Sequence, residues 1–207
     1  MKYYKILNKN RESCHGGECK WAYRKWMPHI DNIEACRRGY HVCREQDLVY
    51  WLNEAIWEVE IKGETIELDD KVVASDARLV RKIKAWNEKA ARLFACDCAE
   101  HVLKYARKQD RATLENTIAV ARRFANGKAT KDELADARDA ALDAAWDAAW
   151  AAALAAALDD ALDDAWDAAR AAARDAAWAA RAAARAALAA ERKWQTDRLM
   201  VYLRGEA

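Results

Sequence analysis

Apolar and polar residues alternate along four short stretches in the first part of the chain. Lys2–Leu7 and Ile56–Lys62 follow the two-residue period most clearly. Lys71–Ala74 and Ala77–Ile83 continue in the same style. This period is typical of β-strands that bury one face, so we predict four strands here.

Turn and helix signals fall between these stretches. Gly63 and the pair Asp69-Asp70 are expected to form turns, and Asp47–Leu52 a short helix. Strands and a helix in one short segment indicate a layered fold. We therefore predict a small mixed α/β domain over residues 1–83.

From Lys84 onward the apolar period changes to three and four residues, which is typical of amphipathic helices. Asp110 is a plausible N-cap for a helix over Arg111–Ala125, which Asn126-Gly127 would end. Thr130 and Glu133 have the spacing of a capping box at the start of the next helix. The first predicted helix carries its apolar stripe on Trp86, Ala90, Leu93, Phe94, Cys98, Val102 and Tyr105.

The C-terminal third is rich in alanine and tryptophan and contains a stripe of large residues at strict four-residue spacing. Each step of four overshoots a helical turn by about 40°, so the stripe would circle a single straight helix. We expect a break near Leu158–Asp160 and a last amphipathic helix over Lys193–Leu203. The predicted fold class is α+β, with an all-α alanine-rich helical bundle over residues 84–207. The stripe consists of Leu142, Trp146, Trp150, Leu154, Leu158, Leu162, Trp166, Arg170, Arg174 and Trp178.

The charge balance is nearly neutral, with 35 basic and 34 acidic residues and a net charge of +1. Acidic residues dominate from Asp132 to Asp167 and arginines from Arg170 onward. The acidic run would repel a nucleic-acid backbone, so no nucleic-acid polymer is expected as a partner. The two segments can neutralise each other between antiparallel helices, within one chain or in a homo-oligomer, and we expect a homo-oligomer.

The apolar stretches exclude a membrane role, and the cysteines favour a reducing compartment. The N-terminus lacks an apolar core of signal-peptide length. The longest apolar stretch, Ala148–Leu158, is too short to cross a bilayer. Six cysteines without an export signal are most simply reduced thiols. We expect a cytoplasmic protein.

Several segments resemble a known family. Asp76–Ile83, Ala91–Leu103, Ala121–Thr130 and Glu191–Leu199 are similar to alanine-rich helical proteins of phages and bacteria that are described as immunity proteins. The front of the chain resembles a small module common at the N-termini of phage proteins of unknown function. The resemblance implies a phage or mobile-element setting and a role in host–phage or toxin–immunity conflict, and it carries no catalytic residues. The front-end segments are Gly39–Cys43, Trp57–Gly63 and Lys71–Ala74.

The late tryptophans and arginines are the main candidates for ligand binding. Aromatic faces stack on bases, and guanidinium groups bind phosphate oxygens in pairs. The alternative is that these indoles fill gaps between alanine-lined helices and that the arginines pair with aspartates. The candidate ligand-binding residues are Trp166, Arg170, Arg174, Trp178, Arg181, Arg185 and Trp194.

Three further groups of residues suggest other chemistry. Asp97 and His101 lie one helical turn apart, which is half of a catalytic arrangement or a surface pair. Glu58 and Glu60, with His41 and Tyr3, vaguely resemble the acidic strand of ADP-ribosyl-transferring enzymes. Zinc is an alternative to the expected absence of a cofactor. Its candidate ligands, spaced more widely than in a tight zinc knuckle, are Cys14, Cys19, Cys36 and Cys43.

The leading hypothesis is a non-enzymatic, phage-type binding protein that sequesters a small phosphorylated or nucleotide-derived immune signal. One alternative is an immunity-like module that binds a toxin or a defence protein through an exposed helical face. A second alternative is an ADP-ribosyl-transfer-like enzyme with its site in the N-terminal domain.

Overall fold

The computed structural model describes residues 1–14, 19–105, 108–140 and 187–207. The chain divides into two compact units. The sheet unit combines Met1–Ala91 with Arg192–Ala207, and the helical unit is Arg92–Glu191. The sheet unit is therefore assembled from two separate stretches of sequence.

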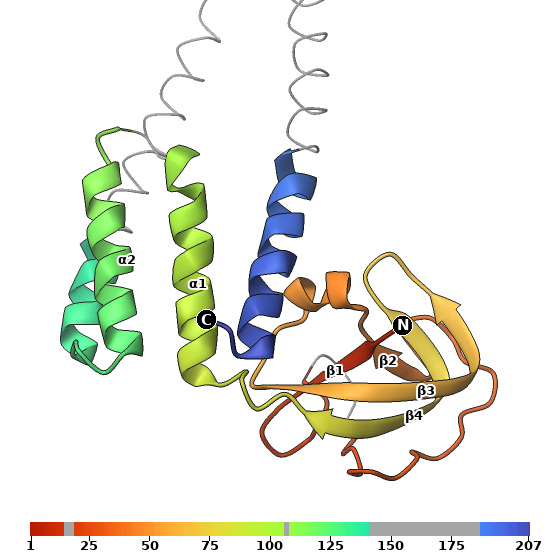
Figure 1. Cartoon of the computed structure of the whole chain (residues 1–207). Helices are drawn as coiled ribbons and strands as arrows, with labels where there is room; N and C mark the ends of the chain where they lie inside the picture. Colours follow the sequence, from red (N-terminus) through yellow and green to blue (C-terminus); the bar gives the residue numbers. More distant parts are fainter. Residues whose placement is uncertain (15–18, 106–107, 141–186) are drawn as a thin grey trace, which may run out of the picture. The chain divides into compact units, whose positions relative to one another are not determined.

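A four-stranded antiparallel sheet forms the centre of the sheet unit (Figure 1). Its edge strands meet, because Tyr4 and Cys43 exchange two backbone hydrogen bonds of 2.8 Å. The sheet thus curls until its two edges touch at one position. In the order β1-β3-β4-β2, the strands are β1 (Tyr3–Leu7), β3 (Ala55–Glu67), β4 (Val72–Lys82) and β2 (Tyr40–Val42).

The strand predictions for β1 and β3 are confirmed, whereas the turn predicted at Gly63 is wrong. Gly63 lies inside β3 with a φ of 75°, where the register with β4 shifts between Lys62 and Thr65. At this bulge the Glu64 backbone N–H donates to Ser75 Oγ at 3.0 Å. Because the polar Ser75 is satisfied in this way, the two strands predicted on either side of it are one continuous strand, β4.

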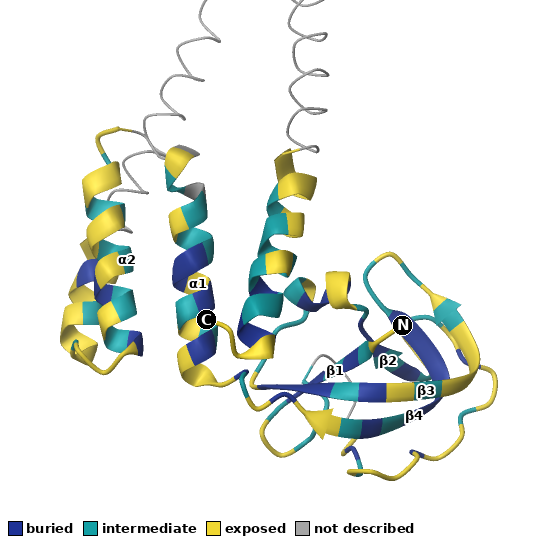
Figure 2. Ribbon diagram, viewed as in Figure 1, coloured by how far each residue is buried: buried dark blue, intermediate teal, exposed yellow. Residues whose placement is uncertain are grey.

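Side chains on one side of the sheet form a closely packed core, and the segment before β2 covers part of it. Trp21 is almost fully buried and packs edge-to-face on Tyr40, with ring centroids 5.3 Å apart. Residues 24–30 donate backbone hydrogen bonds to β4, as from Met27 N–H to the Ala77 carbonyl at 2.9 Å. Figure 2 shows the buried residues concentrated along the strands. The core cluster consists of Leu7, Trp21, Met27, Tyr40, Val42, Ala55, Trp57, Val59, Val72, Ala77 and Leu79.

The predicted last helix is confirmed, but it does not belong to a helical bundle. Residues 187–204 are helical, and from Arg192 they are part of the sheet unit. Leu199 is fully buried, and Arg192 donates to the Tyr50 hydroxyl at 2.7 Å in the 3-10 helix η1 (Glu45–Tyr50). The predicted fold class is therefore wrong. The described chain is a four-stranded antiparallel sheet followed by helices, and an all-α bundle over residues 84–207 is not shown, because the apolar face of the last helix is buried within the sheet unit.

The predicted helix end at Asn126-Gly127 and the predicted start at Thr130 are confirmed, whereas the Asp110 side chain makes no capping hydrogen bond. Between the sheet and residue 140 the described chain forms helices. They are α1 (Glu88–Val102), η2 (Leu103–Tyr105), α2 (Arg111–Ala125) and a helical stretch over residues 131–140.

The capping contacts explain these boundaries. The Thr130 N–H donates to Glu133 at 2.7 Å, and the Glu133 N–H donates to Thr130 Oγ1 at 3.1 Å, which confirms the capping box. Gly127 adopts a φ of 68°, and the Lys128 N–H donates to the Arg123 carbonyl, which ends α2 as predicted. None of the helices that the structure describes has the length and apolar character needed to cross a membrane.

Candidate functional site: a cationic cavity at the sheet edges

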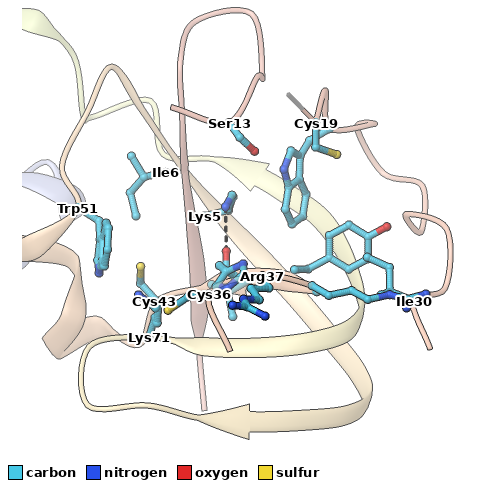
Figure 3. Close-up of a pocket in the computed structure, with 16 residues that line it drawn as sticks. Lys5, Ile6, Ser13, Cys19, Ile30, Cys36, Arg37, Cys43, Trp51 and Lys71 are labelled. Carbon is cyan, nitrogen blue, oxygen red and sulfur yellow. Dashed lines mark hydrogen bonds between the residues drawn. The ribbon is translucent and has the colours of Figure 1, made fainter. Parts of the chain in front are cut away.

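A cavity of about 480 Å³ lies at the edge strands of the sheet unit (Figure 3). It involves residues of β1, all of β2 and the segments that flank them. Its volume is in the range of small-molecule sites. The lining residues are Lys5, Ile6, Ser13, Cys19, Trp21, Ile30, Cys36, Arg37, Arg38, Gly39, Tyr40, His41, Val42, Cys43, Trp51 and Lys71.

Lys5 is the most unusual residue of this lining. Its ammonium donates to the His41 carbonyl at 2.9 Å and lies 5.2 Å from the centre of the Trp21 ring. No carboxylate within the described part of the chain forms an ion pair with it. Burial lowers the pKa of Lys5, and the nearby thiols of Cys43, Cys14 and Cys19 oppose this shift. A half-buried cation with only a neutral acceptor and an aromatic face can receive an anion.

The position of Lys5 follows from the alternation along β1. Tyr3, Lys5 and Leu7 share one face of the strand, and Leu7 belongs to the core cluster, against which Tyr3 packs. The Lys5 side chain therefore lies on the apolar face of the sheet, where it lines the cavity. Because β1 and β2 pair through their backbones only at Tyr4 and Cys43, the Lys5 side chain satisfies a carbonyl of β2 that lacks a strand partner there.

Two ring nitrogens at the cavity are buried and have no hydrogen-bond partner among the described residues: Trp21 Nε1 and His41 Nε2. Burial lowers the pKa of His41, and the charges of Lys5 and Lys71 lower it further. A hydrogen bond with the Gly39 backbone acts in the opposite direction. At neutral pH the ring is therefore uncharged. Buried polar groups without partners are costly, so both nitrogens lower the stability of the unliganded cavity wall.

Three more cations border the cavity. Lys71 lies 4.7 Å above the Trp51 ring and 3.6 Å from the Asp70 carboxylate. Arg37 is exposed and lies 3.3 Å from Glu34, and Arg38 is exposed as well. The described lining contains no aspartate or glutamate. The local charge is thus positive although the whole chain is nearly neutral.

The four candidate zinc ligands do not form a metal site in the described structure. Cys19, Cys36 and Cys43 line the cavity, and the Cys14 thiol lies 3.8 Å from the Ile6 carbonyl oxygen. Burial raises the pKa of Cys43 to about 12 and also raises the pKa of Cys14. Across the described ranges, no three cysteine, histidine or carboxylate side chains are grouped so that they could hold a metal ion. All six cysteines are free thiols.

Most of the predicted ligand-binding residues lie outside the described part of the chain. These are Trp166, Arg170, Arg174, Trp178, Arg181 and Arg185. Trp194 lies in the helix over residues 187–204, where it is half-buried and belongs to the sheet unit. The proposed break near Leu158–Asp160 also lies outside the described residues.

The other catalytic candidates are held in ion pairs. Asp97 is paired with Arg122 at 2.7 Å, and His101 Nε2 lies 3.2 Å from Glu191. Arg81 Nε donates to Glu58 at 2.9 Å, and Arg78 Nε donates to Glu60 at 3.1 Å. These contacts give all four residues a structural role.

Sequence reasoning missed Lys5, Lys71 and the aromatic lining. One local signal was present for Lys5, since it interrupts an otherwise apolar face between Tyr3 and Leu7. Nothing local links it to Trp21, His41 and Lys71, which meet only in the folded chain.

Comparisons with known proteins give one match. Residues 1–91 match the family model of a domain of unknown function, DUF7666. This stretch is less than half of the 207-residue chain, yet it includes every described residue that lines the cavity. It also coincides with the first segment of the sheet unit, Met1–Ala91. No curated protein and no solved structure matches the chain.

Proposed function

We propose that this chain is a non-enzymatic binding protein that captures a small phosphorylated or nucleotide-derived ligand in the cavity at the sheet edges. The observation that carries the proposal is a lining that contains Lys5, Lys71, Arg37 and Arg38 but no described carboxylate. Ammonium and guanidinium groups form charge-assisted hydrogen bonds with phosphate oxygens. The proposal moves the predicted ligand-binding role from the late helices to the N-terminal sheet.

The aromatic lining supports a ligand with a planar group. Trp21, Tyr40 and Trp51 line the same cavity as the cations. A nucleobase gains about 1–3 kcal/mol from stacking on an aromatic ring. A phosphate and a flat ring in one molecule would use both features, whereas inorganic phosphate would use only the cations.

The setting that we propose is the cytosol of a bacterium under phage attack, where the protein would withdraw a defence signal. The resemblance of the sequence to phage modules and immunity proteins supports this setting. The six free thiols agree with a reducing compartment.

Isothermal titration with cyclic nucleotides, mononucleotides and ADP-ribose derivatives tests the proposal. Adenosine, which lacks a phosphate, is the matched neutral ligand. We expect micromolar or tighter binding of at least one anion, and a roughly tenfold or larger loss of affinity in Lys71→Met, because a hydrogen bond to a charged group contributes about 1.5–3 kcal/mol. Lys89→Met, at an exposed position outside the lining, should bind normally. Failure of every anion to bind more tightly than about 1 mM, or about −4 kcal/mol, would overturn the proposal.

A further inference from the structure

The ammonium of Lys5 differs from the other cations of the cavity in what surrounds it. Lys71 and Arg37 each have a carboxylate within 4 Å, and the two arginines are exposed. Lys5 instead contacts the His41 carbonyl and the Trp21 ring, and the thiols of Cys43, Cys14 and Cys19 lie nearby. A half-buried lysine in such surroundings gives up its proton more readily than a fully exposed lysine.

We propose that Lys5 forms an imine with a ligand that carries both a carbonyl group and a phosphate or carboxylate. This inference rests on the proposed function, since the cavity must first attract the anion. It narrows the ligand class to anionic aldehydes and ketones.

The chemistry is balanced without an additional reactant. The ammonium releases a proton to water, and the free amine adds to the carbonyl carbon. The resulting carbinolamine loses its oxygen as water, so a C=N bond replaces the C=O bond and nothing is oxidised or reduced. Desolvated lysines are suited to this step because a larger fraction of them is uncharged.

The remaining cations explain why the ligand must be anionic. When Lys5 becomes a neutral amine, Lys71, Arg37 and Arg38 still give the lining a positive charge. The arginines keep their charge at every physiological pH. They would hold the phosphate or carboxylate while the carbonyl end reaches the amine. The uncharged His41 ring at the same cavity adds no further positive charge.

Borohydride trapping on the full chain tests the inference. The protein is incubated with pyridoxal 5′-phosphate, reduced with borohydride, digested and mapped by mass spectrometry. We expect Lys5 to be modified at concentrations that leave exposed lysines such as Lys89 largely unmodified. Pyridoxal, which lacks the phosphate, should label Lys5 roughly tenfold less efficiently, because it forgoes a charge-assisted hydrogen bond to the cations of the lining.

Two variants locate the adduct. Lys5→Arg keeps the charge but cannot form an imine, so the cavity-specific adduct should disappear, whereas Lys89→Arg should label like the wild type. Labelling of Lys5 no faster than that of exposed lysines, or no labelling of Lys5 in the wild type, would overturn the inference whatever the variants do. Calorimetric binding of AMP to the same protein separates the two proposals: binding without an adduct removes the imine alone, whereas absence of anion binding removes the proposed function.

Discussion

Two charged residues of this protein, Asp97 in the helical unit and Lys5 in the sheet unit, are held in opposite ways. In the helical unit the Asp97 carboxylate, which is 6% exposed, is paired with Arg122 at 2.7 Å. The same guanidinium also contacts Glu100. In the sheet unit the Lys5 ammonium contacts a backbone carbonyl and an indole ring, with no carboxylate partner among the described residues.

The difference separates a charge that serves the fold from one that is available to a ligand. A buried ion pair is self-contained, and removing one partner leaves the other unpaired in a dry environment. A buried charge with only a neutral acceptor costs stability in the unliganded protein. Such a cost is common at binding sites, where the ligand supplies the missing partner.

The division into units is tested by Leu199→Ala. Because Leu199 is fully buried in the sheet unit, the substitution should lower the free energy of unfolding of that unit by about 3 kcal/mol. Urea denaturation followed by tryptophan fluorescence measures it. Leu188→Ala is the matched control, since Leu188 lies in the same helical stretch but is 50% exposed. Equal effects of the two substitutions would contradict the assignment of the last helix to the sheet unit.

Arg122→Met tests the paired charge. It leaves the Asp97 carboxylate buried without its guanidinium, and we expect the free energy of unfolding to fall by about 2–3 kcal/mol. This loss is below the usual range for buried pairs because the Arg122 side chain is itself a third exposed. Circular dichroism during urea denaturation reports on the helices. Arg123→Met removes an exposed pair with Glu133 and should cost less than about 1 kcal/mol. If the two variants lose the same stability, the Asp97 pair is not the structural charge that we infer.

Lys5→Met tests the unpaired charge. Unlike Arg122→Met, it should not lower the free energy of unfolding. A methionine fills similar space without a buried charge, so the free energy of unfolding should stay unchanged or rise by about 1 kcal/mol. The gain is limited because the His41 carbonyl loses its donor. Anion binding should weaken in the same variant. A clear loss of stability would show that Lys5 serves the fold, as Asp97 does.

The smallest effect concerns a pair on the sheet unit between the exposed His29 and the buried Asp76. His29 Nδ1 lies 2.9 Å from Asp76, and this hydrogen bond raises the pKa of His29 and lowers the pKa of Asp76. The contribution of His29 is complete below its ordinary pKa of 6.5 and is lost as the pH rises through the raised value. The contribution of Asp76 is complete above its ordinary pKa of 3.8 and is lost as the pH falls through the lowered value.

The pair should therefore stabilise the protein fully between pH 3.8 and 6.5. Comparing His29→Gln with the wild type by urea denaturation at pH 5.5 and at pH 9 checks this. The stability difference should be larger at pH 5.5. A difference that grows toward alkaline pH would contradict the assigned interaction.

Local signals in the sequence predicted the elements whose causes are local. The alternation in β1 and β3, the Thr130 capping box and the Gly127 helix end each depend on a few neighbouring residues, and the structure confirms them. The continuity of β4 was not predictable in this way. It depends on the bulge at Gly63, which places a backbone N–H on Ser75 from a different strand.

The candidate site escaped sequence reasoning for the same physical reason. Its polar groups come from β1, β2 and the segments near Trp21 and Lys71, and only the folded sheet brings them to one cavity. The abundance of tryptophan and arginine in the C-terminal third of the sequence directed attention away from a single lysine in an apolar strand.

The discontinuous sheet unit has a consequence for how the protein is made. Residues 1–91 leave the ribosome first, but Leu199, Tyr202 and Leu203, which are buried in the same unit, are synthesised about a hundred residues later. Part of the apolar surface of residues 1–91 therefore stays uncovered until the helical unit and the last helix have been translated. A nascent chain stalled before residue 192 would lack these contacts, and the time spent translating the insert would determine how long the segment depends on chaperones.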